Sequence, residues 1–315
     1  MSSVAIAGGT GNIGRTLVEV LSENPKNTVF ILSRKAKQGS TATTDAKATI
    51  VHVDYGDVES LRQAFEKHQI DTVISCLSMT AESSGESELN LIKAADASSV
   101  TRRFIPNDWG VPLPESEISA LPIFKYQKAA IELLKQSKLQ WTVVYIGYIM
   151  DYFGMLHIKT RMVGPPVFVD VANNVAAVPG TGNEPIVLTY SFDLARFVDG
   201  LLGLADWPQQ SVVIGDKLTW NEFVKLAENA RGSKFDVSYD SLETLEAGKV
   251  TGLPAYEDVY SVYAKEEFDY FLAMVGRSMA SGCHDLSFQG SLNELLPQIR
   301  TLSTKEFLEK AWKRE

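Results

Sequence analysis

A glycine-rich segment near the start of the sequence constrains the fold more than any other feature. Residues 8–14 read Gly-Gly-Thr-Gly-Asn-Ile-Gly, and they lie between the apolar run 4–7 and apolar residues at helical spacing. Between a strand and a helix, small residues permit a tight turn, close approach of the backbone to a pyrophosphate, and close helix–strand packing. The sequence therefore predicts a dinucleotide site whose contacts are Gly8, Thr10, Gly11, Asn12, Ile13 and Gly14.

The end of the second predicted strand selects between the two nicotinamide dinucleotides. In such folds an acidic residue there binds the ribose 2′-hydroxyl of NAD, whereas an arginine accommodates the 2′-phosphate of NADP. Residues 25–43 contain no Asp or Glu, and the strand 28–32 is followed by Ser33, Arg34 and Lys35. We expect Arg34 to make a forked contact to the phosphate, with Ser33 or Lys35 assisting. This pattern predicts NADPH/NADP as the cofactor, the alternative being a solvated pair of surface cations.

Strand and helix patterns alternate over the first 150 residues. The predicted strands are 4–7, 28–32, 49–53, 72–77, 103–106 and 141–146, and the predicted helices are 13–21, 58–67, 89–97 and 123–135. Such alternation predicts a Rossmann-type, doubly wound α/β fold with a parallel sheet between two layers of helices. Asp54, at the end of the third strand, is expected to contact the adenine amino group, and Asp57 to cap the next helix.

The pattern changes after residue 150, where loops rich in Gly, Pro and Asn begin. We expect an NADP-binding domain over 1–150 and a smaller, intertwined α/β substrate-binding region over 151–315. The chain is expected to return to the first domain around 185–230, with a strand at 212–214 joining the first sheet. Thr219 and Glu222 have capping-box spacing, and further helices are predicted around 264–273 and 304–312.

Composition excludes several classes of function. The formal charge of −9, from 39 acidic and 30 basic residues, disfavours nucleic-acid binding. The two cysteines, Cys76 and Cys283, and four scattered histidines show no disulfide framework or metal-ligand spacing, so no metal is expected. The apolar stretch 145–156 is too short to span a bilayer and contains Asp151, and the first residues lack a signal-peptide pattern. We expect a soluble, cytoplasmic protein with a small-molecule substrate.

The first 230 residues or so resemble the NmrA-like and isoflavone-reductase-like branch of the atypical short-chain dehydrogenases. The resemblance is carried by residues 8–14, Ser33-Arg34, Val73-Ile74-Ser75 and the octet Arg-Phe-Ile-Pro-Asn-Asp-Trp-Gly at 103–110. The resemblance implies that Ser75, Cys76 and Leu77 lie near the nicotinamide-side ribose, and Asn107 of the octet is assigned to the same cofactor site. It also places the functional lysine of the family at Lys128.

Two segments depart from the family pattern. The Tyr-x-x-x-Lys pattern of short-chain dehydrogenases is replaced by Phe124-Lys-Tyr-Gln-Lys128, so the usual tyrosine acid is absent and Lys128 must carry the role. We expect Lys128 to hold the nicotinamide ribose and to protonate the substrate, with partial burial lowering its pKa. After the sixth strand, Gly147 stands where the family has Asn.

Aromatic residues near these segments are candidates for the substrate pocket. The pocket candidates are Asp108, Tyr126, Tyr148, Tyr152, Phe153 and His157. For the aromatic residues the alternative is a place in the core, and for Asp108 it is a loop cap.

The sequence leaves three functions in view. The first is hydride transfer from NADPH to an electrophilic carbon (C=C, C=N or C=O) of a small aromatic or alkaloid-type secondary metabolite. The second is a non-catalytic NAD(P)-binding regulator, because some NmrA-like proteins resemble redox sensors that bind other proteins. The third is a non-redox cyclase or isomerase that retains NADP. The oligomeric state is not predicted.

Overall fold

The computed structural model describes residues 2–34, 47–77, 82–114 and 124–313. The chain divides into two compact units. Unit 1 comprises residues 1–109, 113–145 and 195–211, and unit 2 comprises residues 110–112, 146–194 and 212–315. The segment 195–211 that returns to unit 1 is shorter than the expected 185–230, and the two units are nearly equal in length.

Unit 1 contains a parallel sheet of six strands with helices on both faces, which confirms the Rossmann-type α/β fold. The sheet order is β3-β2-β1-β4-β5-β6, the order in which two mononucleotide-binding halves meet between β1 and β4. Its elements are β1 (Ser2–Ala7), α1 (Asn12–Glu23), β2 (Asn27–Ser33), β3 (Thr49–His52), α2 (Val58–Lys67), β4 (Thr72–Ser75), α3 (Glu82–Ala97), β5 (Arg103–Ile105), α5 (Lys125–Lys135), β6 (Gln140–Trp141), β7 (Val143–Tyr145), α6 (Ser191–Leu202) and β12 (Gln210–Val212).

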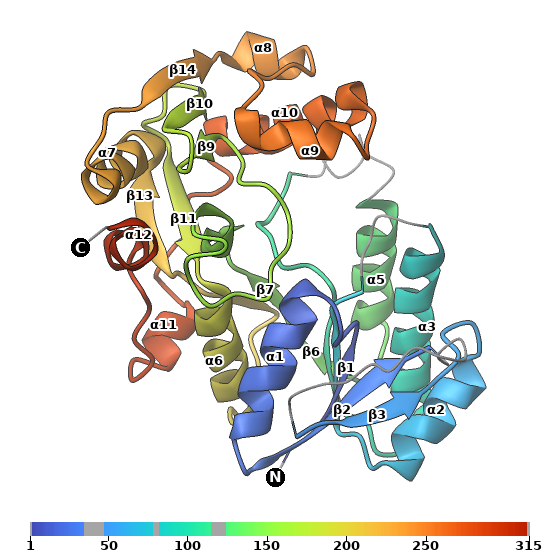
Figure 1. The fold of residues 1–315 in the computed structure, drawn as a ribbon. Helices are drawn as coiled ribbons and strands as arrows, with labels where there is room; N and C mark the ends of the chain where they lie inside the picture. Colours follow the sequence, from blue (N-terminus) through green and yellow to red (C-terminus); the bar gives the residue numbers. More distant parts are fainter. Residues whose placement is uncertain (1, 35–46, 78–81, 115–123, 314–315) are drawn as a thin grey trace. The chain divides into compact units, whose positions relative to one another are not determined.

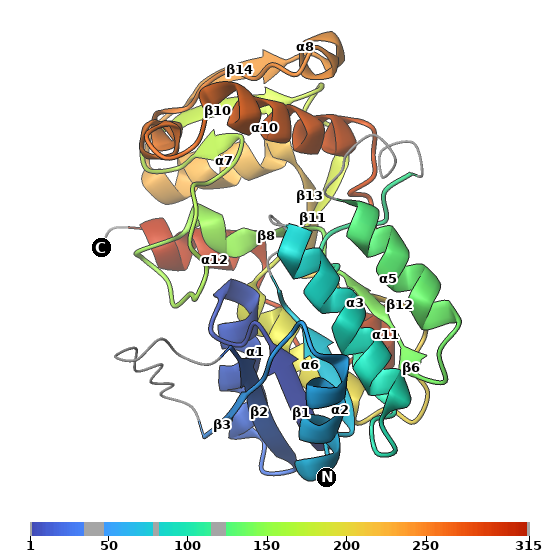
Figure 2. The same cartoon turned by 90° about the vertical axis from the view of Figure 1, so that its right-hand side faces the viewer.

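The helices of unit 1 form one layer on each side of the sheet. Figures 1 and 2 show α2, α3 and α5 side by side on one face, with α3 in the middle, and α1 and α6 on the other. Apolar residues of β1 to β5 are buried against the first layer, together with Leu61, Leu91 and Leu134 from its three helices. On the second face, Asp199 of α6 accepts hydrogen bonds from the amides of Asn24 and Asn27 at 2.9 and 2.6 Å.

Two predictions for unit 1 are wrong in detail. The sixth strand, predicted over 141–146, is interrupted at Thr142, so that β6 pairs with β5 whereas β7 pairs with β12. The Thr142 hydroxyl lies 2.8 Å from the hydroxyl of Ser211, a side-chain bond between the segments that carry β7 and β12. The strand predicted at 212–214 is consequently β12, two residues earlier, and it pairs with β7 rather than with the six-stranded sheet.

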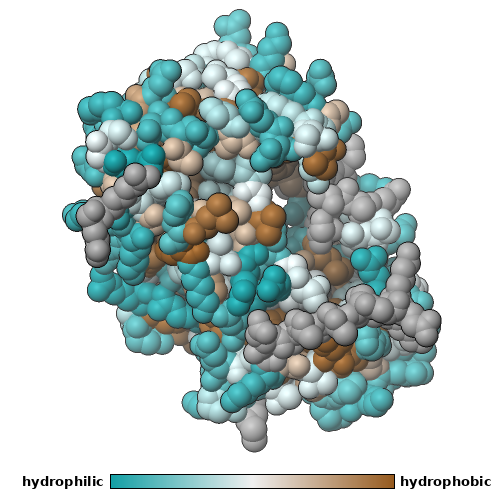
Figure 3. Space-filling model, viewed as in Figure 1, coloured by the Kyte–Doolittle hydropathy of each residue, from teal (hydrophilic) through white to brown (hydrophobic). Residues whose placement is uncertain are grey.

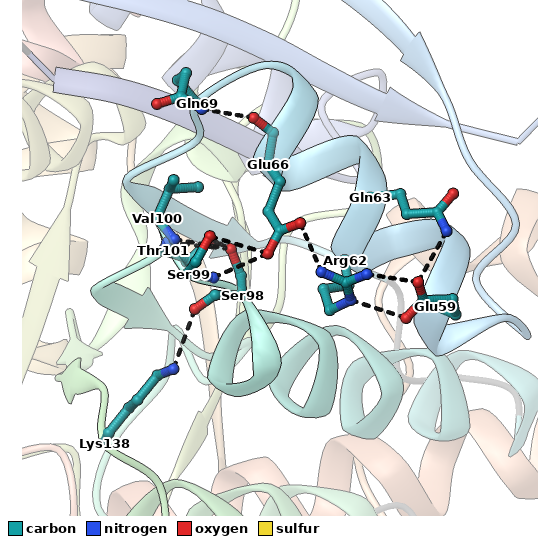
Figure 4. A network of polar contacts seen from close by, with 10 residues as sticks. All are labelled: Glu59, Arg62, Gln63, Glu66, Gln69, Ser98, Ser99, Val100, Thr101 and Lys138. Atoms are coloured by element: carbon teal, nitrogen blue, oxygen red, sulfur yellow. Dashed lines mark hydrogen bonds and ion pairs between the residues drawn. The ribbon is translucent and has the colours of Figure 1, made fainter.

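Polar contacts connect α2 to the loop that precedes β5 (Figure 4). Arg62 lies 2.6 Å from both Glu59 and Glu66, and Glu66 accepts a hydrogen bond from the backbone N–H of Ser99 at 3.1 Å. These bonds hold the pKa of Glu66 below its usual value. Both ion pairs lie within α2 and are partly exposed, so each contributes little to stability. The bond from Ser99 is the contact that joins α2 to the loop before β5.

Unit 2 is built from two small sheets and several helices. The sheet orders are β14-β10-β9 and β13-β11-β8. Its elements are β8 (Tyr148–Ile149), η2 (Met150–Phe153), β9 (Val169–Asp170), β10 (Val175–Pro179), β11 (Pro185–Thr189), β13 (Asp216–Thr219), α7 (Trp220–Arg231), β14 (Asp236–Asp240), α8 (Leu242–Glu246), η3 (Pro254–Tyr256), α9 (Glu257–Tyr260), α10 (Lys265–Ala280), α11 (Leu292–Leu295) and α12 (Thr304–Trp312). Thr219 and Glu222 form the predicted capping box of α7.

The Gly147 departure has a backbone explanation within unit 2. Gly147 has φ +71°, and a Cβ at this position would lie 2.1 Å from the carbonyl oxygen of Val187. A side chain is therefore excluded by both conformation and space. Gly147 is required by the pairing of β8 with β11, one residue further on.

A membrane span requires a helix that is long and apolar. Within the described ranges, every helix is too short or too polar to cross a bilayer. The face in Figure 3 is mainly hydrophilic, with hydrophobic residues in small groups.

Candidate cofactor site

The parallel register of unit 1 brings five of the predicted cofactor segments to one edge of the sheet. Ala7 pairs with Leu32 on one side and Ser75 on the other, so β1, β2 and β4 end level with one another. The glycine loop (residues 8–14) therefore lies between the segments that follow β2 and β4. In open α/β sheets, ligands bind outside these carboxyl ends, where the strand order reverses.

The glycines of the loop have separate structural roles. Gly8 has φ +74°, and a Cβ on it would lie 2.4 Å from the carbonyl oxygen of Cys76. A Cβ on Gly14 would lie 2.2 Å from the carbonyl oxygen of Gly8, which shows how closely α1 packs on the loop. Gly11 is exposed and would meet only Gly8, at 3.4 Å. The fold thus requires Gly8 and Gly14, whereas it leaves space beside Gly11.

The N-terminus of α1 has the features of an anion site. Its N-cap is Gly11, with no capping side chain and no acidic residue in the first turn. By contrast, α2, α7 and α12 each have a side-chain cap and an acidic residue in the first turn. The first N–H groups of a helix have no partner within the helix, and the helix dipole favours a negative charge there. The loop and α1 therefore fit a pyrophosphate.

The predicted adenine-side residues lie at the ends of β2 and β3. Ser33 ends β2, and its hydroxyl donates to the carbonyl of Arg34, whose side chain is exposed. Lys35 lies outside the described residues. Asp54 is exposed and accepts a hydrogen bond from the N–H of Gly56 at 2.8 Å, and Asp57 caps α2 as predicted.

The predicted nicotinamide-side residues form a bonded group at the ends of β4 and β5. The side chain of Ser75 is buried, so it contributes its backbone rather than its hydroxyl to the edge. The Asn107 amide donates to the carbonyl of Leu77 at 2.6 Å, and the Trp109 indole N–H donates to the carbonyl of Ser75 at 3.1 Å. Burial, followed by the charge of Glu88, raises the pKa of the Cys76 thiol, which keeps this thiol protonated at neutral pH.

Lys128 lies in the first turn of α5 and is exposed, so the expected partial burial is not present. Tyr126, two residues earlier, is half-buried against α3. A Cβ on Gly85 of α3 would lie 2.1 Å from the Tyr126 ring, so the ring occupies the space that a side chain at Gly85 would fill.

The remaining pocket candidates are in unit 2, apart from Asp108, which is half-buried after β5. The Tyr148 and Tyr152 rings lie 5.7 Å apart and are partly exposed, so they remain candidates for a pocket wall. Phe153 is 1% exposed and its ring lies 4.7 Å from that of Phe223, so its assignment to the pocket is wrong and it belongs to the core of unit 2. The exposed His157 ring packs at 4.3 Å on Trp312.

Two buried residues of this edge were missed by sequence reasoning. Tyr55 follows β3, and its hydroxyl donates to the carbonyl of Leu32 at 2.9 Å. It therefore ties the segment after β3 to the end of β2. Glu88 of α3 is 1% exposed and accepts a hydrogen bond from the N–H of Asn107 at 2.9 Å. Its position three and four residues before Leu91 and Ile92, on the apolar face of the helix, was a readable signal.

Comparisons with known proteins agree with this geometry. A family model described as NAD(P)H-binding matches residues 8–161. Oxidoreductase swnN from Metarhizium robertsii is 33% identical, over 99% of this chain and 98% of its own length. An isoflavone reductase homolog from Arabidopsis thaliana is 25% identical over 98% of this chain and 97% of its own. The chain belongs to the NmrA-like and isoflavone-reductase-like family. It is an oxidoreductase of this NAD(P)H-binding family.

A solved structure has the same fold. The binary complex of leucoanthocyanidin reductase with NADPH, from Vitis vinifera, superposes with a TM-score of 0.75 over 98% of this chain and 99% of that chain. The two sequences are 18% identical, so this likeness concerns the fold alone.

Proposed function

We propose that this oxidoreductase is an NADPH-dependent reductase, which transfers a hydride to a C=C, C=N or C=O carbon of a small aromatic or alkaloid-type metabolite. The observation that carries the choice of cofactor is the end of β2, where the exposed cation Arg34 stands directly after Ser33. A neutral or acidic side chain there would not attract a 2′-phosphate, whereas a guanidinium binds phosphate with two parallel hydrogen bonds. The leucoanthocyanidin reductase from Vitis vinifera, which was solved in complex with NADPH, supports the same choice.

The chain's own residues would divide the work of binding and proton transfer. The bound cofactor supplies the hydride, with its electron pair, to the substrate carbon. The loop 8–14 and α1 hold the pyrophosphate, and Arg34 holds the 2′-phosphate. Lys128 donates a proton from its ammonium group to the substrate atom that receives the displaced electron pair, and solvent then reprotonates it. One proton and one hydride are thus added to each substrate molecule.

The substrate class is inferred from the character of the candidate wall. Tyr148 and Tyr152 present partly exposed rings, and burial raises the pKa of Tyr152 to about 12, so its phenol stays neutral at physiological pH. Neutral aromatic surfaces with a hydroxyl favour planar apolar ligands over charged ones.

Replacing Arg34 by alanine is expected to weaken NADPH binding by about tenfold or more and to change NADH binding by less than about threefold, because only NADPH has the 2′-phosphate. Dissociation constants for both cofactors, from nicotinamide fluorescence, test this. Lys26→Ala, which removes an exposed cation from the opposite end of β2, is the control and is expected to affect neither. Equal weakening of both cofactors by Arg34→Ala would reject the assignment.

Replacing Gly11 by alanine is expected to separate cofactor binding from folding. The added methyl has space in the free protein, so the free energy of unfolding should change by less than about 0.5 kcal/mol. The same methyl would lie where the pyrophosphate approaches the backbone, so NADPH affinity should fall by about tenfold or more. Gly14→Ala, whose Cβ would clash with the backbone of Gly8, is expected to destabilise the fold as well. Unaltered NADPH affinity in Gly11→Ala would place the pyrophosphate elsewhere.

A further inference from the structure

Glu88 connects the ends of two neighbouring strands, β4 and β5. One carboxylate oxygen accepts the N–H of Asn107, after β5, and the other contacts the hydroxyl of Ser75, at the end of β4. Asn107 in turn bonds to Leu77, and Trp109 bonds to Ser75. Glu88 is thus fixed from both sides within a fully bonded group.

Among the described residues, no cation contributes to the pKa of Glu88. The titratable groups that face it among the described residues are Asp108 after β5, Cys76 after β4 and Tyr55 after β3. Burial, and to a lesser extent the charge of Asp108, raises the pKa of Glu88 to about 7, while the hydrogen bonds from Ser75 and Asn107 oppose this rise. Burying a carboxylate without a cation beside it lowers the stability of the fold. Such residues are often found at functional sites, so we looked for a function of Glu88.

The sheet order indicates which part of the cofactor would lie near this carboxylate. The half formed by β1, β2 and β3 holds the adenosine with its 2′-phosphate, because Arg34 follows β2. The half formed by β4, β5 and β6 then receives the nicotinamide nucleoside. The nicotinamide ring is neutral in NADPH and carries a positive charge in NADP⁺.

We propose that Glu88 is a charge-compensating residue, which stabilises the cationic nicotinamide ring of NADP⁺ relative to the neutral ring of NADPH. This inference rests on the proposed function, because it requires the cofactor at this edge. Ionised Glu88 would place a negative charge in the half of the edge assigned to the nicotinamide, and it would therefore lower the free energy of the complex with NADP⁺. Protonated Glu88 is neutral and does not stabilise the complex with NADP⁺ in this way. The proton that Glu88 loses when NADP⁺ binds goes to solvent.

The test is equilibrium binding of NADP⁺ and NADPH between pH 6 and pH 8.5, by fluorescence for NADPH and by competition for NADP⁺. The ratio of the two dissociation constants cancels the titration of the 2′-phosphate, which both cofactors carry. In the unaltered protein we expect the affinity for NADP⁺, relative to the affinity for NADPH, to increase by about fivefold or more as pH rises. This size is in keeping with a charge pair at low to moderate dielectric. Glu88→Gln should make the ratio independent of pH. Glu86→Gln, an exposed carboxylate on the same helix, is the control.

Two further variants make the assignment specific to Glu88. Ser75→Ala removes a bond that lowers the pKa of Glu88, so the midpoint of the ratio should move to higher pH. Asp108→Asn removes a charge that raises this pKa, so the midpoint should move to lower pH. A pH-dependent ratio that persists in Glu88→Gln, or a flat ratio in the unaltered protein, would overturn the inference while leaving the proposed function intact. Failure of both cofactors to bind would refute the proposed function instead.

Discussion

Lys128→Ala is expected to lower turnover by about 10²-fold or more while NADPH still binds, because it removes the proton donor but none of the phosphate contacts. A panel of cyclic imines, enones and phenylpropanoids is first screened for a compound that the protein reduces. With that compound, kcat is measured from the oxidation of NADPH, and the NADPH dissociation constant is measured separately. Lys128→Arg keeps the positive charge near the ribose but releases its proton far less readily. It should bind NADPH as the unaltered protein does and still turn over slowly.

Lys135→Ala is the matched control for this experiment. Lys135 is exposed in the last turn of the same helix and pairs with Glu132 at 2.7 Å. Its loss should leave kcat within about twofold, as expected of an exposed ion pair. Unchanged turnover in Lys128→Ala would eliminate the catalytic role and move the proton donor to another group or to solvent.

Glu88→Gln is expected to make the cofactor-free protein more stable at pH 8, by up to about 3 kcal/mol, since one pKa unit corresponds to about 1.4 kcal/mol. The pKa of Glu88 is about 7 in the folded protein against 4.5 without the fold. The folded state therefore binds more protons between these values, and its free energy of unfolding falls as pH rises from about 4.5 to about 7. Glutamine carries no charge and retains an acceptor for Asn107 and a donor for Ser75.

Urea unfolding across this pH range tests the prediction. The difference between the Glu88→Gln and unaltered curves isolates Glu88 from the exposed carboxylates, such as Glu59, whose pKa is lowered by Arg62. Glu86→Gln should parallel the unaltered protein throughout. Parallel curves for Glu88→Gln as well would show that the carboxylate is ionised at no cost, contrary to its burial.

The sequence predicted the sheet of unit 1 well because its determinants are local. The apolar run 29–32 and the β-rich run 72–75 became buried strands, and the glycine loop marked the turn between the first strand and the first helix. The break at Thr142 was not predictable, because it involves a side-chain bond to Ser211, some seventy residues away.

The candidate site was predictable only where a residue lies one or two positions after the end of a strand. Arg34, Asp54, Leu77 and Asn107 all meet this condition, and all lie at the carboxyl edge. Glu88 was missed because it reaches the edge from within a helix. Its place on the apolar face could be read from the spacing to Leu91 and Ile92, whereas its contacts with Ser75 and Asn107 depend on how α3 packs against the sheet. Phe153 was listed as a pocket candidate because the sequence alone does not distinguish an aromatic side chain in a pocket wall from one in the core. Its packing in unit 2 decides for the core.

Transfer of the cofactor's own hydrogen tests the central claim most directly. The protein would be incubated with the same substrate panel and with NADPH that carries deuterium at C4, on each face of the nicotinamide ring in turn. The deuterium content of the product would be measured by mass spectrometry. We expect one deuterium per product molecule from one of the two faces, with one NADPH consumed. Product that forms without deuterium from either label, while NADPH is retained, would contradict hydride transfer and favour a non-redox cyclase or isomerase.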